Sequence, residues 1–193
     1  MSGTVLAIEH LTAGYEDAAV LRDLDLSVGE GEVVALLGAN GAGKTTTLRA
    51  VSGVVHPMEG RIVLDGQDLA GASISARARR GIAHVPENRG VFFGLTVAEH
   101  FRLGHRTERL DEPAAGLDTS ESEELGRQLR VLANRGHSML LIDHDMGFVL
   151  SVCDRIYVLE FGKMIASGPP DAVRKDQKVI TAYLGSAAAE LAT

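Results

Sequence analysis

The stretch Val33–Ala50, "VVALLGANGAGKTTTLRA", decides the fold, because an apolar strand, a glycine-rich turn and a helix follow one another in it. Val33–Gly38 is a continuous apolar run, which is typical of a central strand covered on both faces. The next segment, Gly38–Thr45 ("GANGAGKT"), matches the pattern of a phosphate-binding loop at every required position. The helix should continue through "KTTTLRAVSG" and end near Gly53 and Pro57.

This loop is suited to hold a polyphosphate. Its glycines let consecutive backbone N–H groups turn inward, and the start of the helix adds the positive end of its dipole. Lys44 would reach the β- and γ-phosphates, and the hydroxyl of Thr45 would bind Mg²⁺. The alternative is a glycine-rich turn that contains Lys-Thr by chance. The predicted ligands are ATP and Mg²⁺, and the predicted ATP-binding residues here are Gly38, Ala39, Asn40, Gly41, Ala42, Gly43, Lys44, Thr45 and Thr46.

Composition sets the broad class of the protein. The 193 residues suffice for one domain with a proper core, and 45% apolar with 23% charged residues is ordinary for a soluble globular chain. A formal charge of −7 disfavours nucleic acid as a partner. Cys153 is the single cysteine, so an internal disulfide is excluded and a small packed side chain is the simplest role. No apolar run approaches the roughly 20 residues that span a bilayer, so work at a membrane would need a partner.

The remaining pattern predicts an α/β fold: a mostly parallel sheet with flanking helices, as in P-loop NTPases, plus an antiparallel β subdomain. Residues 1–185 are expected to form one nucleotide-binding domain, followed by a frayed tail at residues 186–193. Expected strands are Val5–Glu9, Leu21–Val28, Arg61–Gly66, Gly81–Pro86, Ser138–Asp143 and a hairpin over Arg155–Gly168 that turns at Phe161-Gly162; expected helices are Leu117–Asn134, Pro170–Arg174 and Gln177–Leu184.

Two further motifs contain carboxylate and imidazole side chains that are suited to ATP hydrolysis. In "LDEP" (Leu110–Pro113), Asp111 would stand near the metal and Glu112 would polarise the attacking water. Taken alone, Asp-Glu-Pro is more often a solvated turn. His144 in "LLIDHD" follows this pair by one helix and one strand, which favours a γ-phosphate sensor over a merely structural histidine. The predicted catalytic residues are therefore Glu112, His144 and Lys44.

Together these motifs resemble the ATP-binding subunits of ABC transporters, from Val5 to about Gly185. Tyr15 stands where that family stacks an aromatic ring on adenine, although an ordinary half-buried tyrosine is the alternative. "VPENRGVFFGLTVAEH" (Val85–His100) looks like the family's Q-loop region, with Glu87 where most relatives carry glutamine. A carboxylate there can still approach Mg²⁺, so the implied metal residues are Thr45, Asp111 and Glu87.

The resemblance also implies a function and partners. The Q-loop region and the segment from Leu140 onward look most like subunits that import branched-chain amino acids. The implied partners are transmembrane permease subunits, a second ATP-binding subunit that completes a dimer and, indirectly, a solute-binding protein. The implied location is cytoplasmic, on the inner face of the cell membrane.

Asp118 would contact the opposite subunit or cap a helix. A P-loop kinase or DNA-repair ATPase is weaker, because the chain shows no acceptor lid and no basic stripe.

One family part is absent from the sequence. ABC ATPases carry a helical subdomain between the Q-loop and the Asp-Glu pair, ending in a Ser-Gly-Gly signature that is found nowhere in this chain. Glu87 and Asp111 are only 24 positions apart, room for one helix over Val97–Leu103. We therefore expect an internal loss between about residues 103 and 110. The alternative function is a nucleotide-binding module with little turnover, working, if at all, beside an intact ATPase subunit.

The residues before Asp111 are charged where the family has aliphatic side chains. Burying Arg106, Glu108 and Arg109 in a doubly covered strand would cost about several kcal/mol per ion, against a total stability of about 5–15 kcal/mol. We therefore expect a loop, an edge or a distorted strand there. The histidines other than His144 show no metal-binding spacing backed by carboxylates or cysteines, so no ligand role is predicted for His10, His56, His84, His100, His105 and His137.

Overall fold

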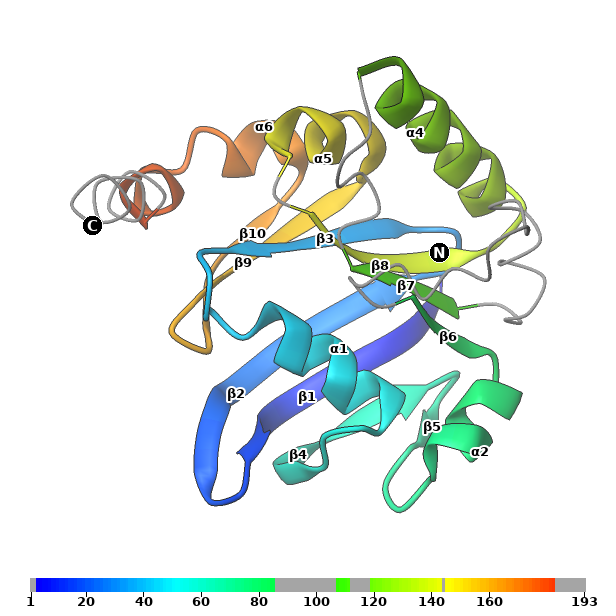
Figure 1. Ribbon diagram of the computed structural model, residues 1–193, viewed down its shortest axis with the longest axis vertical. Coiled ribbons are helices and arrows are strands. Elements are labelled where there is room, and N and C mark those ends of the chain that lie inside the picture. The colour runs from blue at the N-terminus through cyan, green and yellow to red at the C-terminus, as the bar shows by residue number, and fades with distance from the viewer. Residues whose placement is uncertain (1–2, 86–106, 112–118, 144, 183–193) are drawn as a thin grey trace.

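The computed structural model describes residues 3–85, 107–111, 119–143 and 145–182, which form two sheets and their covering helices (Figure 1). One sheet has the order β2-β1-β4-β5 and the other the order β10-β9-β3-β8-β7-β6. The elements are β1 (Thr4–Tyr15), β2 (Ala18–Gly29), β3 (Val33–Gly38), α1 (Lys44–Ser52), β4 (Pro57–Leu64), β5 (Gln67–Asp68), α2 (Ile74–Arg79), β6 (Ile82–Val85), β7 (Thr107–Asp111), α4 (Thr119–Ala133), β8 (Ser138–Ile142), α5 (Met146–Val152), β9 (Arg155–Glu160), β10 (Lys163–Gly168) and α6 (Pro170–Val173). The predicted fold class is confirmed.

The central strand β3 separates two apolar cores. It pairs in parallel with β9 on one side and β8 on the other, and its residues Val33–Leu37 are fully buried. Val34 and Leu36 pack with the antiparallel sheet and α1, whereas Val33, Ala35 and Leu37 pack with α4 and α5. Figure 1 shows the same layers, with α4, α5 and α6 above the six-stranded sheet and α1, β1 and β2 below it. The alternation of a strand's side chains thus produces both cores from one apolar run.

The tight turns follow from residues that tolerate positive φ. The β9–β10 hairpin turns at Phe161 and Gly162, with φ of 47° and 78°, and β4 leads into β5 through Asp65 and Gly66, with φ of 48° and 75°. Such paired positive φ values suit a two-residue hairpin, where glycine is favoured at the second position. Both turns lie where the sequence predicts them. β1 is longer than predicted, because bulges carry it on from Glu9 to Tyr15.

The expectation that the charged segment before Asp111 forms a loop, an edge or a distorted strand is wrong. Thr107–Asp111 is strand β7, paired in regular parallel register with β8 on one side and β6 on the other. The cost of desolvation applies to side-chain charges, whereas strand pairing is made by backbone N–H and C=O groups, so a charged sequence can still form a strand that is hydrogen-bonded on both sides. The neighbouring strand β6 is the edge of the sheet, and its Ala83 and His84 are only half-buried.

A buried arginine fixes the far end of α1. The helix ends at Gly53, which has a φ of 86° and serves as its C-cap. The guanidinium of Arg77, on α2, is 2% exposed and donates to the carbonyl oxygens of Ala50 (2.8 Å) and Val51 (3.0 Å). It also donates to the carbonyl of Leu69 at 3.0 Å. Arg77 thus gives the carbonyl of Val51 a donor at the end of the helix and adds a second donor to the carbonyl of Ala50, which also accepts from the amide of Gly53.

Candidate functional site

The loop between β3 and α1 is held open by glycines. Gly43 is the N-cap of α1 with a φ of 108°, and a Cβ there would lie 2.6 Å from Cδ2 of Leu21. Gly38 has a φ of 152°, and a Cβ there would collide with the carbonyl oxygen of Leu159 on β9. Among the described residues, no side chain caps the start of α1, and the first amides of a helix have no acceptor within the helix itself.

Lys44 lies against the loop that it follows. Its Nζ donates to the carbonyl oxygens of Gly38 at 2.8 Å and Ala39 at 3.1 Å, and the side chain is half-buried. Thr45 is half-buried as well, whereas Thr46 is 6% exposed. An ammonium group, the start of a helix and a glycine turn are thereby brought together in one place, which is the arrangement that favours an anion.

The β9–β10 turn contacts the loop between β3 and α1 through a backbone hydrogen bond. The amide of Gly162 donates to the carbonyl of Ala42 at 3.0 Å, and the carbonyl of Gly162 accepts from the amide of Arg22 at 2.9 Å. A Cβ on Gly162 would collide with the carbonyl oxygen of Val20. The hairpin, β2 and the loop therefore meet through backbone hydrogen bonds at a distance that only glycine allows, and Nη1 of Arg22 also donates to the carbonyl of Phe161 at 3.4 Å.

Tyr15 ends β1 and is 43% exposed, which is more than a packed core tyrosine would show. Its hydroxyl accepts a hydrogen bond of 2.9 Å from Nη1 of Arg49 on α1. The helix that carries Lys44 thus holds the aromatic ring by its outer end. The adenine contact of Tyr15 stays a prediction.

The carboxyl ends of β3, β7 and β8 lie along one edge of the parallel sheet. Asp111 ends β7 opposite Ile142 of β8, and Asp143 follows directly. Asp143 is 2% exposed, and its Oδ1 accepts from the amide of Asp145 at 3.0 Å. Asp145 in turn caps α5 by accepting from the amide of Phe148 at 3.0 Å. The predicted residues Glu87, Glu112, Asp118 and His144 lie outside the described residues.

Asp143 is a buried carboxylate beside the candidate site, and the sequence-based prediction did not include it. A buried carboxylate at the end of an apolar strand, directly before His144, can orient the backbone on which that histidine stands. The available signal was "LLIDHD" itself, since an aspartate that ends a buried strand needs hydrogen-bond donors.

A cavity of about 840 Å³ adjoins the other side of the loop. It lies between the loop, the end of β9 and the helical residues 177–182, and its lining includes Asn40, Glu160, Ile165, Lys178 and Thr181. None of the described lining residues belongs to β7 or β8, the strands at whose carboxyl end Asp111 lies opposite Ile142.

Comparisons with known proteins place the chain in a family. A family model described as "ABC transporter" matches residues 21–141, and one described as "Branched-chain amino acid ATP-binding cassette transporter" matches residues 163–189. The lipopolysaccharide export system ATP-binding protein LptB of Haemophilus influenzae is 32% identical, over 94% of this chain and 98% of that protein. The high-affinity branched-chain amino acid transport ATP-binding protein LivG of Salmonella typhimurium is 29% identical, over 97% of this chain and all of that protein.

The comparisons also bear on the fold and on the missing segment. A solved ATP-binding cassette of an ABC transporter superposes with a TM-score of 0.81 at 19% identity, covering 95% of this chain and 99% of that one. The alignment with the Haemophilus protein spans 235 residues, 42 more than the 193 of this chain, so that relative carries residues that have no counterpart here. The chain is an ATP-binding subunit of the ABC transporter family, truncated in a way consistent with a missing subdomain.

Proposed function

We propose that the chain binds MgATP through residues 38–46. The observation that carries this proposal is the position of Lys44, whose ammonium is bonded to the carbonyls of Gly38 and Ala39 beside an uncapped helix start. A triphosphate would offer Lys44 stronger, charged acceptors than these two carbonyls. The ammonium group of Lys44 therefore already lies at the loop, and on binding it would exchange its carbonyl acceptors for phosphate oxygens.

The other residues would divide the remaining tasks. The Thr45 hydroxyl and the Asp111 carboxylate would hold Mg²⁺, with Glu87 as a further candidate, and Tyr15 would stack on adenine. Glu112 would polarise water and His144 would contact the γ-phosphate. The bound magnesium would neutralise charge on the phosphates.

We infer that the intact system imports branched-chain or related amino acids. The match of residues 163–189 to the branched-chain family model and the likeness to LivG support this cargo. The competing candidate is lipopolysaccharide export, favoured by the somewhat higher identity to LptB. The partners would be permease subunits, a second ATP-binding subunit and a solute-binding protein, and the chain would work at the inner face of the membrane. Among the described residues, no helix is both long and apolar enough to cross a bilayer.

We further propose that the isolated chain turns over little ATP. The family's signature helix points its N-terminus at the nucleotide of the opposite subunit, and the sequence lacks the Ser-Gly-Gly of that helix. Two copies of this chain would each lack the group that completes the other's site. Pairing with an intact ATPase subunit would supply one signature and restore one of the two sites.

Binding is tested by thermal unfolding with and without MgATP. Ligand at about 100 times its Kd adds ~2.7 kcal/mol to the free energy of unfolding, so the melting temperature should rise. Lys44→Ala should abolish this rise, because the phosphate oxygens lose their ammonium. The matched control is Lys163→Ala, which removes an exposed lysine of β10. Equal stabilisation of the Lys44 variant and the wild type would refute the site.

Turnover is tested by steady-state ATP hydrolysis, first with the chain alone and then with an intact family member added. The chain alone should stay near background, and Glu112→Gln should change this little. Hydrolysis should rise in the mixture beyond that of the intact subunit by itself. Strong hydrolysis by the chain alone, lost in the Glu112 variant, would show that the missing segment is not needed.

Cargo is tested by deleting the gene in its host and measuring two quantities. Uptake of labelled leucine should fall, while the amount of lipopolysaccharide at the cell surface should stay constant. The reverse result would reassign the chain to lipopolysaccharide export without affecting the proposed ATP site.

A further inference from the structure

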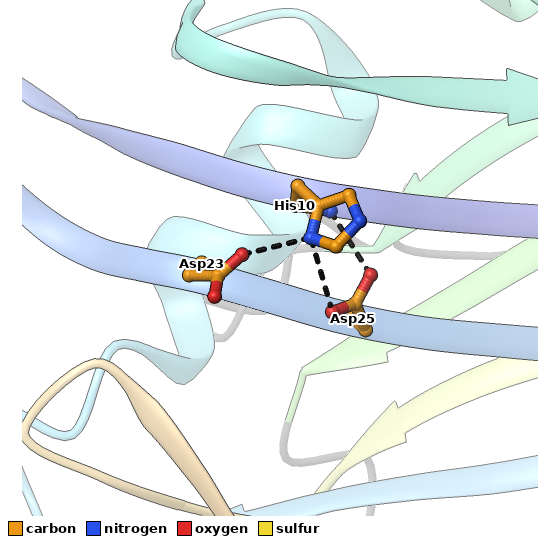
Figure 2. A group of neighbouring side chains, drawn as sticks. All are labelled: His10, Asp23 and Asp25. Carbon is orange, nitrogen blue, oxygen red and sulfur yellow. Dashed lines mark hydrogen bonds and ion pairs between the residues drawn. The ribbon is translucent and has the colours of Figure 1, made fainter.

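His10 of β1 faces two aspartates of β2 on the exposed surface of the antiparallel sheet (Figure 2). Its Nδ1 lies 2.9 Å from Oδ1 of Asp23 and 3.6 Å from Oδ2 of Asp25. The amide of His10 also donates to Oδ1 of Asp25 at 3.0 Å, which orients that carboxylate. The spacing of residues around His10 in the sequence does not reveal these carboxylates, because they lie on the neighbouring strand.

Two β-bulges bring these side chains together. Ile8 pairs with Leu26 and Leu11 with Leu24, so β1 has one extra residue there. Leu11 pairs with Leu24 and Ala13 with Leu21, so the extra residue then lies on β2. Bulges re-aim a side chain by bending and twisting the strand.

The backbone at the bulges departs from ordinary strand geometry. His10 and Asp23 have positive φ values of 51° and 53°. Gly60 on β4 passes directly beneath the first bulge, where a Cβ would collide with the carbonyl oxygens of Glu9 and His10. The chain thus accepts unfavourable φ angles at two of the three clustered residues, and a glycine of the adjacent strand makes room for them.

The spacing of the ligand atoms fits one metal ion. Two atoms bound at about 2.1 Å to a common ion lie about 3.0 Å apart at a right angle and about 3.4 Å apart at a tetrahedral angle. The measured separations of 2.9 Å and 3.6 Å bracket these values, and all the potential ligand atoms lie within 4.8 Å of one another. Among the residues that the structure describes, this is the one such group of histidine, cysteine and carboxylates.

We propose that His10, Asp23 and Asp25 form a surface site for a divalent transition-metal ion, held by one imidazole nitrogen and two carboxylates. The imidazole distinguishes this trio from an ordinary acidic patch, because nitrogen ligands select zinc and its neighbours over magnesium and calcium. Three protein ligands leave the remaining positions to water. The ion would join the two bulges and so tie β1 to β2.

A proton competes with the metal for the same nitrogen. The hydrogen bond to Asp23 and the negative charges of Asp25 and Asp23 raise the pKa of His10 above its usual value of 6.5. The carboxylates that would bind the ion therefore also stabilise the imidazolium, so a proton and the ion compete for Nδ1 of His10. Affinity should rise with pH until the imidazole is neutral.

The experiment uses the chain after treatment with a chelator, with Zn²⁺ as the probe, no nucleotide present and binding measured by isothermal titration calorimetry. His10→Asn and Asp23→Asn are suitable variants, because asparagine tolerates positive φ and circular dichroism can confirm the fold. Each should weaken one Zn²⁺ site at least about tenfold. His56→Asn, an exposed histidine elsewhere, should leave the affinity unchanged. Undiminished Zn²⁺ binding in the His10 variant overturns the proposal, as does a folded wild-type chain without a Zn²⁺ site.

A second measurement needs no variant. Diethylpyrocarbonate modifies exposed imidazoles, and peptide mass spectrometry locates the product. Zn²⁺ should protect His10 by at least about tenfold while His56 stays reactive, because coordination removes the nucleophilic lone pair of the nitrogen. Equal modification of His10 with and without Zn²⁺ would overturn the proposal even if the variants failed to fold. Neither readout depends on ATP, so a negative result leaves the nucleotide site unaffected.

Discussion

The two halves of the parallel sheet are held in different ways. At β3, all the residues Val33–Leu37 are buried, and both faces are covered by apolar side chains from other elements. At β6, the edge beside β7, Ile82 is buried but Ala83 and His84 are only half-buried. The glycine-rich loop therefore follows a strand of the covered half, whereas Asp111 ends the strand that pairs with the half-buried edge strand β6.

The difference between β3 and β7 shows two ways in which a strand can be held in a sheet: burial of apolar side chains and hydrogen bonding of the backbone. β3 is determined by burial, since its apolar run can be satisfied only in the interior. β7 has the charged sequence "TERLD" and is held in place by backbone pairing to β6 and β8. Apolar burial contributes the larger share of folding stability, so substitutions near the loop should cost far more than those on β7.

Outside the two apolar cores, the largest effect is expected at Gly162, where the β9–β10 turn meets β2. Gly162→Ala should lower the free energy of unfolding by at least about 3 kcal/mol, because the new Cβ must displace the Val20 backbone. The matched control is Gly66→Ala, since Gly66 has nearly the same φ (75° against 78°) but nothing within 4 Å of its Cβ position. That control should lose only about 1–2 kcal/mol, the cost of the left-handed conformation alone. Urea denaturation measures both, and similar losses would show that the contact with β2 is soft.

The next effect is expected at Arg77, which contacts the C-terminal end of α1. Arg77→Ala should lower the free energy of unfolding by about 3 kcal/mol, because a large buried side chain is removed and the carbonyl of Val51 loses its guanidinium donor. The carbonyls of Ala50 and Leu69 also accept from backbone amides, so each of them loses one of two donors. Arg79→Ala, which truncates an exposed arginine of the same helix, should change it by less than about 0.5 kcal/mol. Chemical denaturation of the two variants tests this, and a loss below 1 kcal/mol at Arg77 would mean that water replaces the guanidinium.

The sequence predicts the structure best where a short local pattern of residues restricts the backbone to one conformation. The strand Val33–Gly38, the helix from Lys44 and the turn at Phe161-Gly162 all lie where they were predicted. An apolar run, a glycine-rich loop and a pair of turn residues each restrict the backbone locally, so neighbouring sequence suffices to place them.

Contacts between distant segments could not be predicted in this way. The capping role of Arg77 needs α1 and α2 to be side by side, and the cluster at His10 needs bulges on two strands. Strand β7 was misjudged because its charges were weighed and its backbone partners were unknown. Each of these depends on pairing across 12 or more residues of sequence, which no local pattern records.

A smaller effect is expected from making β7 resemble β3. Glu108→Val should raise the free energy of unfolding by about 0.5–1 kcal/mol, because valine suits a paired strand better than glutamate does. Val34→Glu on β3 is the contrasting variant, and it should unfold the chain, since Val34 is fully buried. Thermal unfolding measures both. A loss of stability in the Glu108 variant would mean that this end of the sheet depends on its charge and that pairing alone does not explain β7.

The exposure of the two halves of the sheet to solvent can finally be compared by thiol labelling, with cysteine substitutions that should change stability little. Burial raises the pKa of Cys153 to about 12, and Asp154 adds to the shift, so only on the order of one thiol in 10⁴ is ionised at pH 8. Reaction with iodoacetamide should therefore be slow in the native wild type and fast in urea. In a Cys153→Ser background, a cysteine introduced by Ala83→Cys on half-buried β6 should react at least about tenfold faster than native Cys153, because it is closer to water. Mass spectrometry follows both reactions over time. Equal rates would mean that the edge strand is as well protected as the covered half, and the contrast between β3 and β6 would then be one of composition only.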